Sequence, residues 1–136
     1  MCGIVGFTGR RQAAPILLDG LARLEYRGYD SAGLAVRNGA ETPVVVKAKG
    51  RLRVLYEKTD GGNAVNGCCG IGHTRWATHG EPSEVNAHPH ASDDMAVVAV
   101  HNGIIENYQE LREKLVKNGY RFISQTDTEV AVKLID

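Results

Sequence analysis

The sequence has neither an excess of charge of one sign nor a long hydrophobic run. Its 136 residues hold 16 Lys and Arg against 16 Asp and Glu, so the formal net charge at pH 7 is zero. A neutral chain has no long-range field to attract nucleic acid or an anionic membrane, and neither is an expected partner. The longest aliphatic run, residues 95–100, is far shorter than the ~18–20 residues that a membrane-spanning helix needs. No transmembrane helix is predicted.

Cysteine is also scarce, and its spacing argues against disulfides. Cys68 and Cys69 are adjacent, which strains a mutual disulfide, and Cys2 stands alone near the N-terminus. There is no Cys-x-x-Cys motif, so a thioredoxin-like site or a zinc knuckle has no support. The apolar stretch at the N-terminus is too short for a secretory signal, and the basic pair Arg10-Arg11 follows it. A reduced, cytoplasmic location is therefore expected.

The spacing of apolar residues alternates between strand-like and helical periods. Short apolar runs predict strands at 4–7, 34–36, 44–46, 69–73, 95–101 and 122–123. Helical spacing predicts helices at 14–27, near 52–56, at 108–117 and at 130–136. This order of elements indicates one layered domain of helices and strands, rather than a helical bundle or an all-β sandwich.

Three local signals predict turns and helix ends. Asn38-Gly39 predicts a hairpin between the second and third strands. Gly119 is expected to end the helix at 108–117. The pattern Thr126-x-x-Glu129 predicts a capping box at the start of the last helix.

Chemistry enters at Cys2, which directly follows the initiator methionine. Removal of Met1 would place a thiol and a free α-amine on one residue. An α-amine has a pKa of ~7.7–8.0, so near neutral pH part of it can accept the thiol proton. Cys2 is thus a candidate nucleophile with its own base. Alternatively, it is only the first apolar residue of a strand.

Polar residues that follow the central strands are further candidates. Arg75 stands near a predicted strand end, where its planar fork would suit a carboxylate, or where it forms a surface ion pair. Asn102 and Gly103 offer two adjacent donors, as in an oxyanion hole, or form an ordinary Asn-Gly turn. Asp127 could bind a ligand ammonium or favour a helix N-terminus. Local pattern alone leaves each pair of interpretations open.

Together these segments resemble the class II, N-terminal-nucleophile glutamine amidotransferases over the whole chain. The matching motifs are Cys2-Gly-Ile-Val-Gly6, Tyr26-Arg-Gly-Tyr-Asp-Ser-Ala-Gly33, His73-Thr-Arg-Trp-Ala-Thr-His-Gly80, His101-Asn-Gly103 and Thr126-Asp-Thr-Glu129. Within that class, the second and third motifs are more similar to the glutaminase domains of glucosamine-6-phosphate synthases than to those of amidophosphoribosyltransferases or asparagine synthetases.

The resemblance implies catalytic roles at matching positions. Cys2 would attack the side-chain amide of L-glutamine, with its freed amine as base. Asn102 and Gly103 would stabilise the oxyanion. Trp76 would lie beside the exit for ammonia, and Arg27 close to the nucleophile. Glutamate and ammonia would be the products.

The resemblance also implies how the substrate is held. Arg75, with Thr78 and His79 nearby, would bind the α-carboxylate of glutamine. Asp127 and Gly103 would hold its α-ammonium group. The implied chemistry uses neither a metal nor a cofactor.

The implied fold is of the α+β class, the four-layer αββα sandwich of N-terminal-nucleophile hydrolases. Family glutaminase domains are longer than this chain, so residues 1–136 are expected to be the N-terminal portion of one. The sugar isomerase domains that would pass ammonia to fructose 6-phosphate are absent from the sequence. Missing strands would expose apolar edges, which favours pairing with a second copy as a homodimer.

Two alternatives stand beside this interpretation. The four histidines His73, His79, His88 and His90 fall in one stretch and suggest a His-ligated zinc hydrolase. No Asp or Glu stands at a recognisable ligand spacing among them. The other alternative is a catalytically inactive folded fragment, since an uncleaved Met1 would keep the Cys2 amine in a peptide bond.

Overall fold

A four-stranded antiparallel sheet forms one half of the molecule in the computed structural model, which describes residues 1–77 and 80–136. Its strands are β1 (Gly3–Thr8), β2 (Ser31–Arg37), β3 (Val44–Lys49) and β4 (Cys69–Arg75), in the order β1-β4-β2-β3. The β2–β3 pair is the predicted hairpin. Gly3 pairs with Thr74 and Ser31 with Arg75, so the start of β1, the start of β2 and the end of β4 lie together at one end of the sheet.

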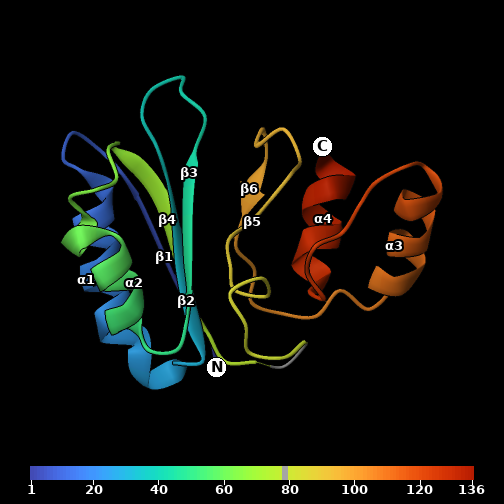
Figure 1. Cartoon of the computed structure of the whole chain (residues 1–136), viewed down its shortest axis with the longest axis horizontal. Helices are drawn as coiled ribbons and strands as arrows, with labels where there is room; N and C mark the ends of the chain where they lie inside the picture. Colours follow the sequence, from blue (N-terminus) through green and yellow to red (C-terminus); the bar gives the residue numbers. More distant parts are fainter. Residues whose placement is uncertain (78–79) are drawn as a thin grey trace.

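Two helices cover the outer face of this sheet (Figure 1). They are α1 (Ala13–Leu24), extended by a short 3-10 turn at Glu25–Arg27, and α2 (Leu52–Lys58), followed by a second 3-10 turn at Asp60–Gly62. Apolar residues at helical spacing on α1 face the sheet because both surfaces leave water only by packing together. Leu17, Leu21, Leu34 and Leu55 are completely buried in this core.

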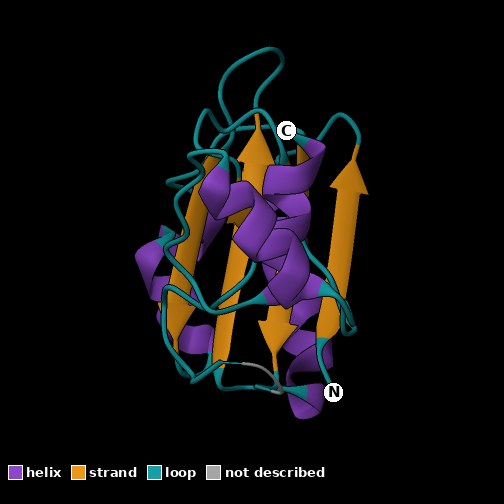
Figure 2. Cartoon of the chain, turned by 90° about the vertical axis from the view of Figure 1, so that its right-hand side faces the viewer, coloured by secondary structure: helices purple, strands orange, loops and turns teal. Residues whose placement is uncertain are grey.

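The opposite face of the sheet is covered by the second half of the chain. A small antiparallel sheet pairs β5 (His90–Ala91) with β6 (Val98–Ala99). Beyond it lie α4 (Asp127–Ile135) and then α3 (Tyr108–Lys117), as Figures 1 and 2 show from two directions. The layers run helix, sheet, sheet, helix, which confirms the predicted αββα sandwich of the α+β class. None of the helices in the described part of the chain is long and apolar enough to cross a membrane.

The predicted elements of the first half are confirmed, and those of the second half are confirmed only in part. The predicted strand 95–101 contains just the two residues of β6, and β5 was not predicted. The strand predicted at 122–123 is wrong. There the backbone N–H of Ile123, and that of Ser124 after it, donate to the Glu129 carboxylate instead of a neighbouring strand.

The two helix-end signals have opposite outcomes. Gly119 follows α3 with φ of 93°, and the N–H of Tyr120 donates to the carbonyl of Leu115, as in a Schellman motif. The capping box at Thr126 is wrong. Thr126 is the N-cap residue without a side-chain capping bond, because its Oγ1 contacts His90 and Ser124, while Glu129 binds the backbone before the helix.

Candidate active site

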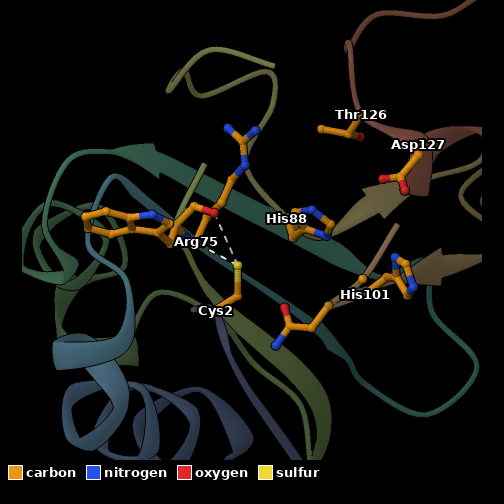
Figure 3. A pocket seen from close by; sticks show the side chains of 9 residues that line it. Cys2, Arg75, His88, His101, Thr126 and Asp127 are labelled. Carbon is orange, nitrogen blue, oxygen red and sulfur yellow. Dashed lines mark hydrogen bonds between the residues drawn. The ribbon is translucent and has the colours of Figure 1, made fainter. Parts of the chain in front are cut away.

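Cys2 lies immediately before β1, at the end of the first sheet where β1 and β2 begin and β4 ends. Its thiol Sγ is 3.5 Å from the carbonyl oxygen of Trp76, to which it donates, and 3.3 Å from the Trp76 N–H, which donates to it (Figure 3). The antiparallel pairing of β1 with β4 sets this position, because it brings residue 2 opposite the end of β4. The N-terminal thiol is therefore fixed beside the segment that carries Arg75 and Trp76.

The segment before β2 supports that end of β4. Asp30 accepts from the N–H of Ala77 through Oδ2 and from the Ser31 hydroxyl through Oδ1, and its own N–H donates to the Arg75 carbonyl. A Cβ atom at Gly28 would lie 2.8 Å from backbone atoms of Arg75 and Trp76, so only glycine permits this approach. The Arg27–Gly33 motif thus serves as a backbone support here, a function that its sequence did not suggest.

Six of the predicted site residues, Cys2 among them, line one pocket (Figure 3). Three further residues complete its lining, namely His88, His101 and Thr126. The predicted residues are Cys2, Arg75, Trp76, Asn102, Gly103 and Asp127. Thr78 and His79, also predicted to bind substrate, lie outside the described residues.

Asn102 and Gly103 follow β6 and form the exposed rim of the pocket. The Asn102 Oδ1 atom lies 2.8 Å from His73 Nε2. An amide oxygen only accepts, so this contact leaves the Nδ2 hydrogens of Asn102 as donors for a ligand. Gly103 has φ of 158°, and a Cβ atom there would lie 2.9 Å from His101 Nε2. An ordinary Asn-Gly turn does not require these contacts.

Asp127 is the first residue of α4 and is nearly buried, with 6% of its surface exposed. Its Oδ2 accepts from the N–H of Ile105 at 2.7 Å. The carboxylate is thus bound to the loop that carries Asn102 and Gly103 rather than to the first turn of its own helix. Oδ1 can accept from a ligand in the pocket, which suits an ammonium group.

Arg75 is only 3% exposed, which rules out the surface ion pair considered from sequence. Its guanidinium donates to the carbonyls of Gly80 and Glu81, at 3.0 Å and 3.1 Å. Figure 3 shows the side chain extending away from Cys2. A ligand that contacts both the thiol and Arg75 must therefore extend along the pocket.

Trp76 lines the pocket, and Arg27 lines a neighbouring cavity that also contacts Cys2. The Trp76 ring is 46% exposed and packs edge-on against Tyr29, with ring centroids 5.6 Å apart. Arg27 and Met1 line a second cavity together with Cys2, Asn102, Gly103 and Ile104. Arg27 Nη2 is 3.8 Å from the Met1 sulfur. Met1 itself is 78% exposed and accessible from solvent.

A stack of buried imidazoles underlies the pocket. The rings of His73 and His88 are parallel, with centroids 4.2 Å apart and 18° between their planes. His90 meets His88 edge-on at 4.7 Å, and His90 Nε2 lies 2.8 Å from Thr126 Oγ1. Burial is the main cause that lowers the pKa of His73 to about 4 and that of His90 to about 3, and it lowers the pKa of His88 still further. All three are neutral at pH 7.

This stacking differs from a zinc site. Zinc ligands direct their in-plane lone pairs to one point, whereas parallel rings face each other through their π surfaces. Within residues 1–77 and 80–136, no group of three or more His, Cys, Asp or Glu side chains has the geometry to hold a metal ion. His79 lies outside those ranges, and the described histidines do not favour the zinc hydrolase alternative.

The sequence did not predict that His88, His101 and Thr126 line the pocket, and it offered His88 only as a zinc ligand. His88 comes from the loop before β5, and His101 precedes Asn102 with its Nδ1 3.4 Å from Thr128 Oγ1. His101 and Thr126 belong to motifs already quoted for the family resemblance, which was the available signal. His88 had none besides its place in the His-rich stretch.

Comparisons with known proteins agree with this geometry. A family profile described as a glutamine amidotransferase domain matches residues 59–136, more than half of the chain. Three curated relatives are each named glutamine–fructose-6-phosphate aminotransferase [isomerizing]. Those from Caldanaerobacter subterraneus and Thermus thermophilus are 57% identical over 136 residues, and that from Symbiobacterium thermophilum is 60% identical. The chain spans only 22% of the length of each relative, although they match 99–100% of the chain.

Solved structures extend the comparison to the fold. Glutamine phosphoribosylpyrophosphate amidotransferase from B. subtilis, in complex with ADP and GMP, superposes with a TM-score of 0.83 at 28% identity. The match covers 99% of this chain and 29% of that one. A second structure, an allosteric regulatory enzyme of purine biosynthesis, matches with the same values. The sandwich is therefore that of N-terminal-nucleophile amidotransferases, and the chain belongs to the glutamine amidotransferase family of enzymes.

Proposed function

We propose that this chain hydrolyses L-glutamine to glutamate and ammonia at the pocket that Cys2 lines. The observation that carries the proposal is the convergence of a terminal thiol, an amide donor and a buried carboxylate on one pocket from distant parts of the chain. Glutamine matches these groups because its reactive amide and its charged α-groups lie at opposite ends of the molecule.

The buried charges support the orientation of the substrate. The Arg75 guanidinium would take the α-carboxylate, and the Asp127 carboxylate would take the α-ammonium. Thr78 and His79 are proposed to contribute beside Arg75. The amide end of glutamine would then lie near Cys2 and Asn102, where the chemistry takes place.

The proposed reaction has two steps. The Cys2 thiolate attacks the amide carbon of the glutamine side chain and forms a tetrahedral oxyanion, which accepts from Asn102 Nδ2 and from the Gly103 N–H. The C–N bond then breaks, and the protonated amine of Cys2 gives its proton to the leaving ammonia. Water attacks the γ-glutamyl thioester and releases glutamate and the thiol.

This scheme requires removal of Met1, because the amine of Cys2 is otherwise part of a peptide bond. Met1 is highly exposed, so a processing enzyme can reach it. Its side chain shares a cavity with Cys2, Arg27 and Asn102, and its sulfur contacts Arg27. Removal of Met1 would therefore free the base and enlarge the space beside the thiol in a single event.

We further propose that the chain is the amidotransferase portion of a longer enzyme that passes ammonia to fructose 6-phosphate. The names of relatives at 57–60% identity support this acceptor, and the 22% coverage of their length is consistent with further domains. Trp76 is proposed to lie beside the route of the ammonia. The free state of all three cysteines is consistent with a reduced cytoplasm as its location.

Glutamine hydrolysis by purified full-length protein tests the proposal. Cys2→Ala should abolish release of glutamate and ammonia, while any synthesis from free ammonia should persist. Cys69→Ala is the matched control, because Cys69 is also a free cysteine but lies on β4 outside the pocket. Glutamine use retained by Cys2→Ala would refute the assignment of the nucleophile. Equal loss in both variants would point to a defect of folding and also count against it.

A further inference from the structure

The side chain of Asn102 is held in an unusual way for an exposed residue. Its backbone belongs to the loop after β6, and the residue lies at the rim of the pocket. Yet its Oδ1 reaches 2.8 Å from Nε2 of His73, a residue of β4 that is completely buried. The two residues come from different layers of the sandwich. An oxyanion donor on a loop is thus hydrogen-bonded to β4, an inner strand of the first sheet.

The protonation of His73 gives this contact a direction. His73 is neutral at pH 7 because burial lowers its pKa to about 4, so its ring carries one N–H. A proton on Nδ1 would have no acceptor within hydrogen-bond geometry among the described residues, whereas Nε2 faces the Asn102 amide, so the proton is on Nε2. Nδ1 of His73 is buried and makes no hydrogen bond of normal geometry among the described residues, although the backbone of His101 acts to raise the pKa of the ring. That matches a ring with its single proton on the other nitrogen.

A fixed donor on His73 determines which way the Asn102 amide faces. Rotation of the amide by half a turn would exchange its oxygen and nitrogen and set N–H against N–H. The bond to Nε2–H excludes that orientation. It leaves the Nδ2 hydrogens on the side away from His73, and Asn102 lines the pocket together with Cys2 and Gly103.

His73 cannot readily turn, because the imidazole stack holds its ring. His88 lies parallel to it at 4.2 Å, and the backbone of His88 passes close to β2. A Cβ atom at Gly33 would stand 1.9 Å from the His88 carbonyl oxygen, so only glycine lets this segment approach. His90 then packs on His88 and bonds Thr126, which adjoins Asp127. The stack thus connects the oxyanion end of the pocket with its ammonium end.

We propose that His73 is a positioning residue for glutamine hydrolysis: its Nε2–H fixes the Asn102 amide so that Nδ2 faces the oxygen of the reacting amide. This inference rests on the proposed function, in which Asn102 is an oxyanion donor. His73 does not touch the substrate and acts only through Asn102. Its effect should therefore appear in kcat and depend on the presence of Asn102.

Two substitutions separate the donor from the ring. His73→Phe keeps an aromatic ring for stacking on His88 but removes the N–H. His73→Gln loses the ring but keeps an N–H that can reach Oδ1. Each is compared with Asn102→Ala and with the double variant His73→Phe/Asn102→Ala in the full-length protein. Rates are divided by the number of sites that an electrophilic glutamine analogue titrates, so that unfolded molecules do not count.

The expected pattern is specific. Asn102→Ala should lower kcat by ~10²–10³. His73→Phe should lower kcat by ~10²-fold, because misplacement of a catalytic group by about 1 Å reduces the rate by about this factor. The KM for glutamine should stay within about twofold of the wild-type value. His73→Gln should recover at least tenfold of that loss. The double variant should be no slower than Asn102→Ala, since residues that act through one contact are not additive.

The outcomes distinguish the positioning role of His73 from the oxyanion role of Asn102. If Asn102→Ala falls as expected but His73→Phe keeps its rate, the positioning role is wrong and the proposed function stands. If Asn102→Ala keeps its rate, the oxyanion assignment itself fails. An additive double variant, or a His73→Phe variant that changes KM alone, would also overturn the positioning role.

A spectroscopic measurement on the unmodified protein covers the case in which the variants fail to fold. Long-range proton–nitrogen NMR reports which imidazole nitrogen carries the proton. We expect His73 to be neutral at pH 7 with its proton on Nε2. A proton on Nδ1, or a doubly protonated ring at pH 7, would contradict the inference.

Discussion

The two halves of the sandwich bury different kinds of side chain. Between α1, α2 and the first sheet, the completely buried residues are mainly aliphatic, such as Leu17, Leu21 and Leu34. Between the first sheet and α4, the buried side chains include His88 and Glu129, at 6% and 2% exposure. Aliphatic packing needs only complementary shape, whereas each buried polar group needs a partner. The apolar half can therefore serve as a scaffold, and the polar half places donors and acceptors around the pocket.

Acid should distinguish the halves most strongly. The folded pKa of His73 is about 4 and that of His90 about 3, and the pKa of His88 is lower still, against ~6.5 in the unfolded chain. As the pH falls, the unfolded state binds protons before the folded state does. The contribution of these histidines to the free energy of unfolding is therefore complete above pH 6.5 and is lost as the pH drops toward 4. At pH 5 each histidine should lower the free energy of unfolding by ~2 kcal/mol relative to its value at neutral pH.

Urea unfolding at pH 8, 6.5 and 5 measures this effect. Hydrogen exchange should locate it, with protection of α4 lost before that of α1. An unfolding free energy that stays constant between pH 8 and pH 5 would contradict the buried, neutral state of the histidines.

A pair of glutamates with the same sequence spacing sharpens the comparison. Glu129 and Lys133 are 3.6 Å apart at 2% and 3% side-chain exposure, and Glu129 also accepts from Ser124. Glu129→Ala leaves the backbone N–H groups of Ile123 and Ser124 without their acceptor, while Lys133 keeps its 2.8 Å pair with Asp93. The loss of these buried bonds should lower the free energy of unfolding by ~3–5 kcal/mol, measured by thermal or urea unfolding. Glu110→Ala breaks the 2.9 Å pair with Lys114 at 65% exposure and should cost only ~0.3–0.5 kcal/mol. Similar losses of stability in Glu129→Ala and Glu110→Ala would contradict the expected difference between a buried and an exposed glutamate.

The apolar half should respond in stability but not in chemistry. Leu21→Ala leaves a cavity in the apolar core between α1 and the first sheet and should lower the free energy of unfolding by ~2–5 kcal/mol. The kcat per titrated site should stay unchanged. Val116→Ala is the surface control, because Val116 is 53% exposed, and its change should stay within ~0.5 kcal/mol. A Leu21→Ala variant whose titrated sites turn over slowly would show that the scaffold also tunes the site.

Substrate binding should respond to the charge of Asp127. Asp127→Asn keeps an oxygen that can accept from the Ile105 N–H but loses the negative charge. Loss of a charge-assisted hydrogen bond should raise KM for glutamine by ~10- to 100-fold with little change in kcat. Asp19→Asn, on the exposed face of α1, is the control. An unchanged KM in Asp127→Asn would count against binding of the ammonium group.

The sequence predicted best the features that depend on local contacts. Helix 108–117 and the hairpin at Asn38-Gly39 follow from apolar spacing and turn residues, which act locally. The αββα layers and the six residues that share the pocket came from motif resemblance, since spacing alone left every candidate with a second interpretation.

Polar burial could not be predicted, because a buried Glu or His looks in a sequence like a surface one. Thr126-x-x-Glu129 has the spacing of a capping box, yet Glu129 binds Ile123 and Ser124 before the helix, which also replaced the predicted strand at 122–123. His73 and Asn102 are 29 residues apart, and only the packing of the two layers brings them together.

The central claim is that Cys2 becomes an activated nucleophile when Met1 is removed. The most direct measurement is the intact mass of the purified full-length protein before and after exposure to an electrophilic glutamine analogue. If Cys2 is activated in this way, the chain lacks Met1 and gains one adduct, mapped to Cys2 and slowed by excess L-glutamine. A chain without Met1 that gains no adduct, or gains it at Cys68 or Cys69, would contradict the activation of Cys2.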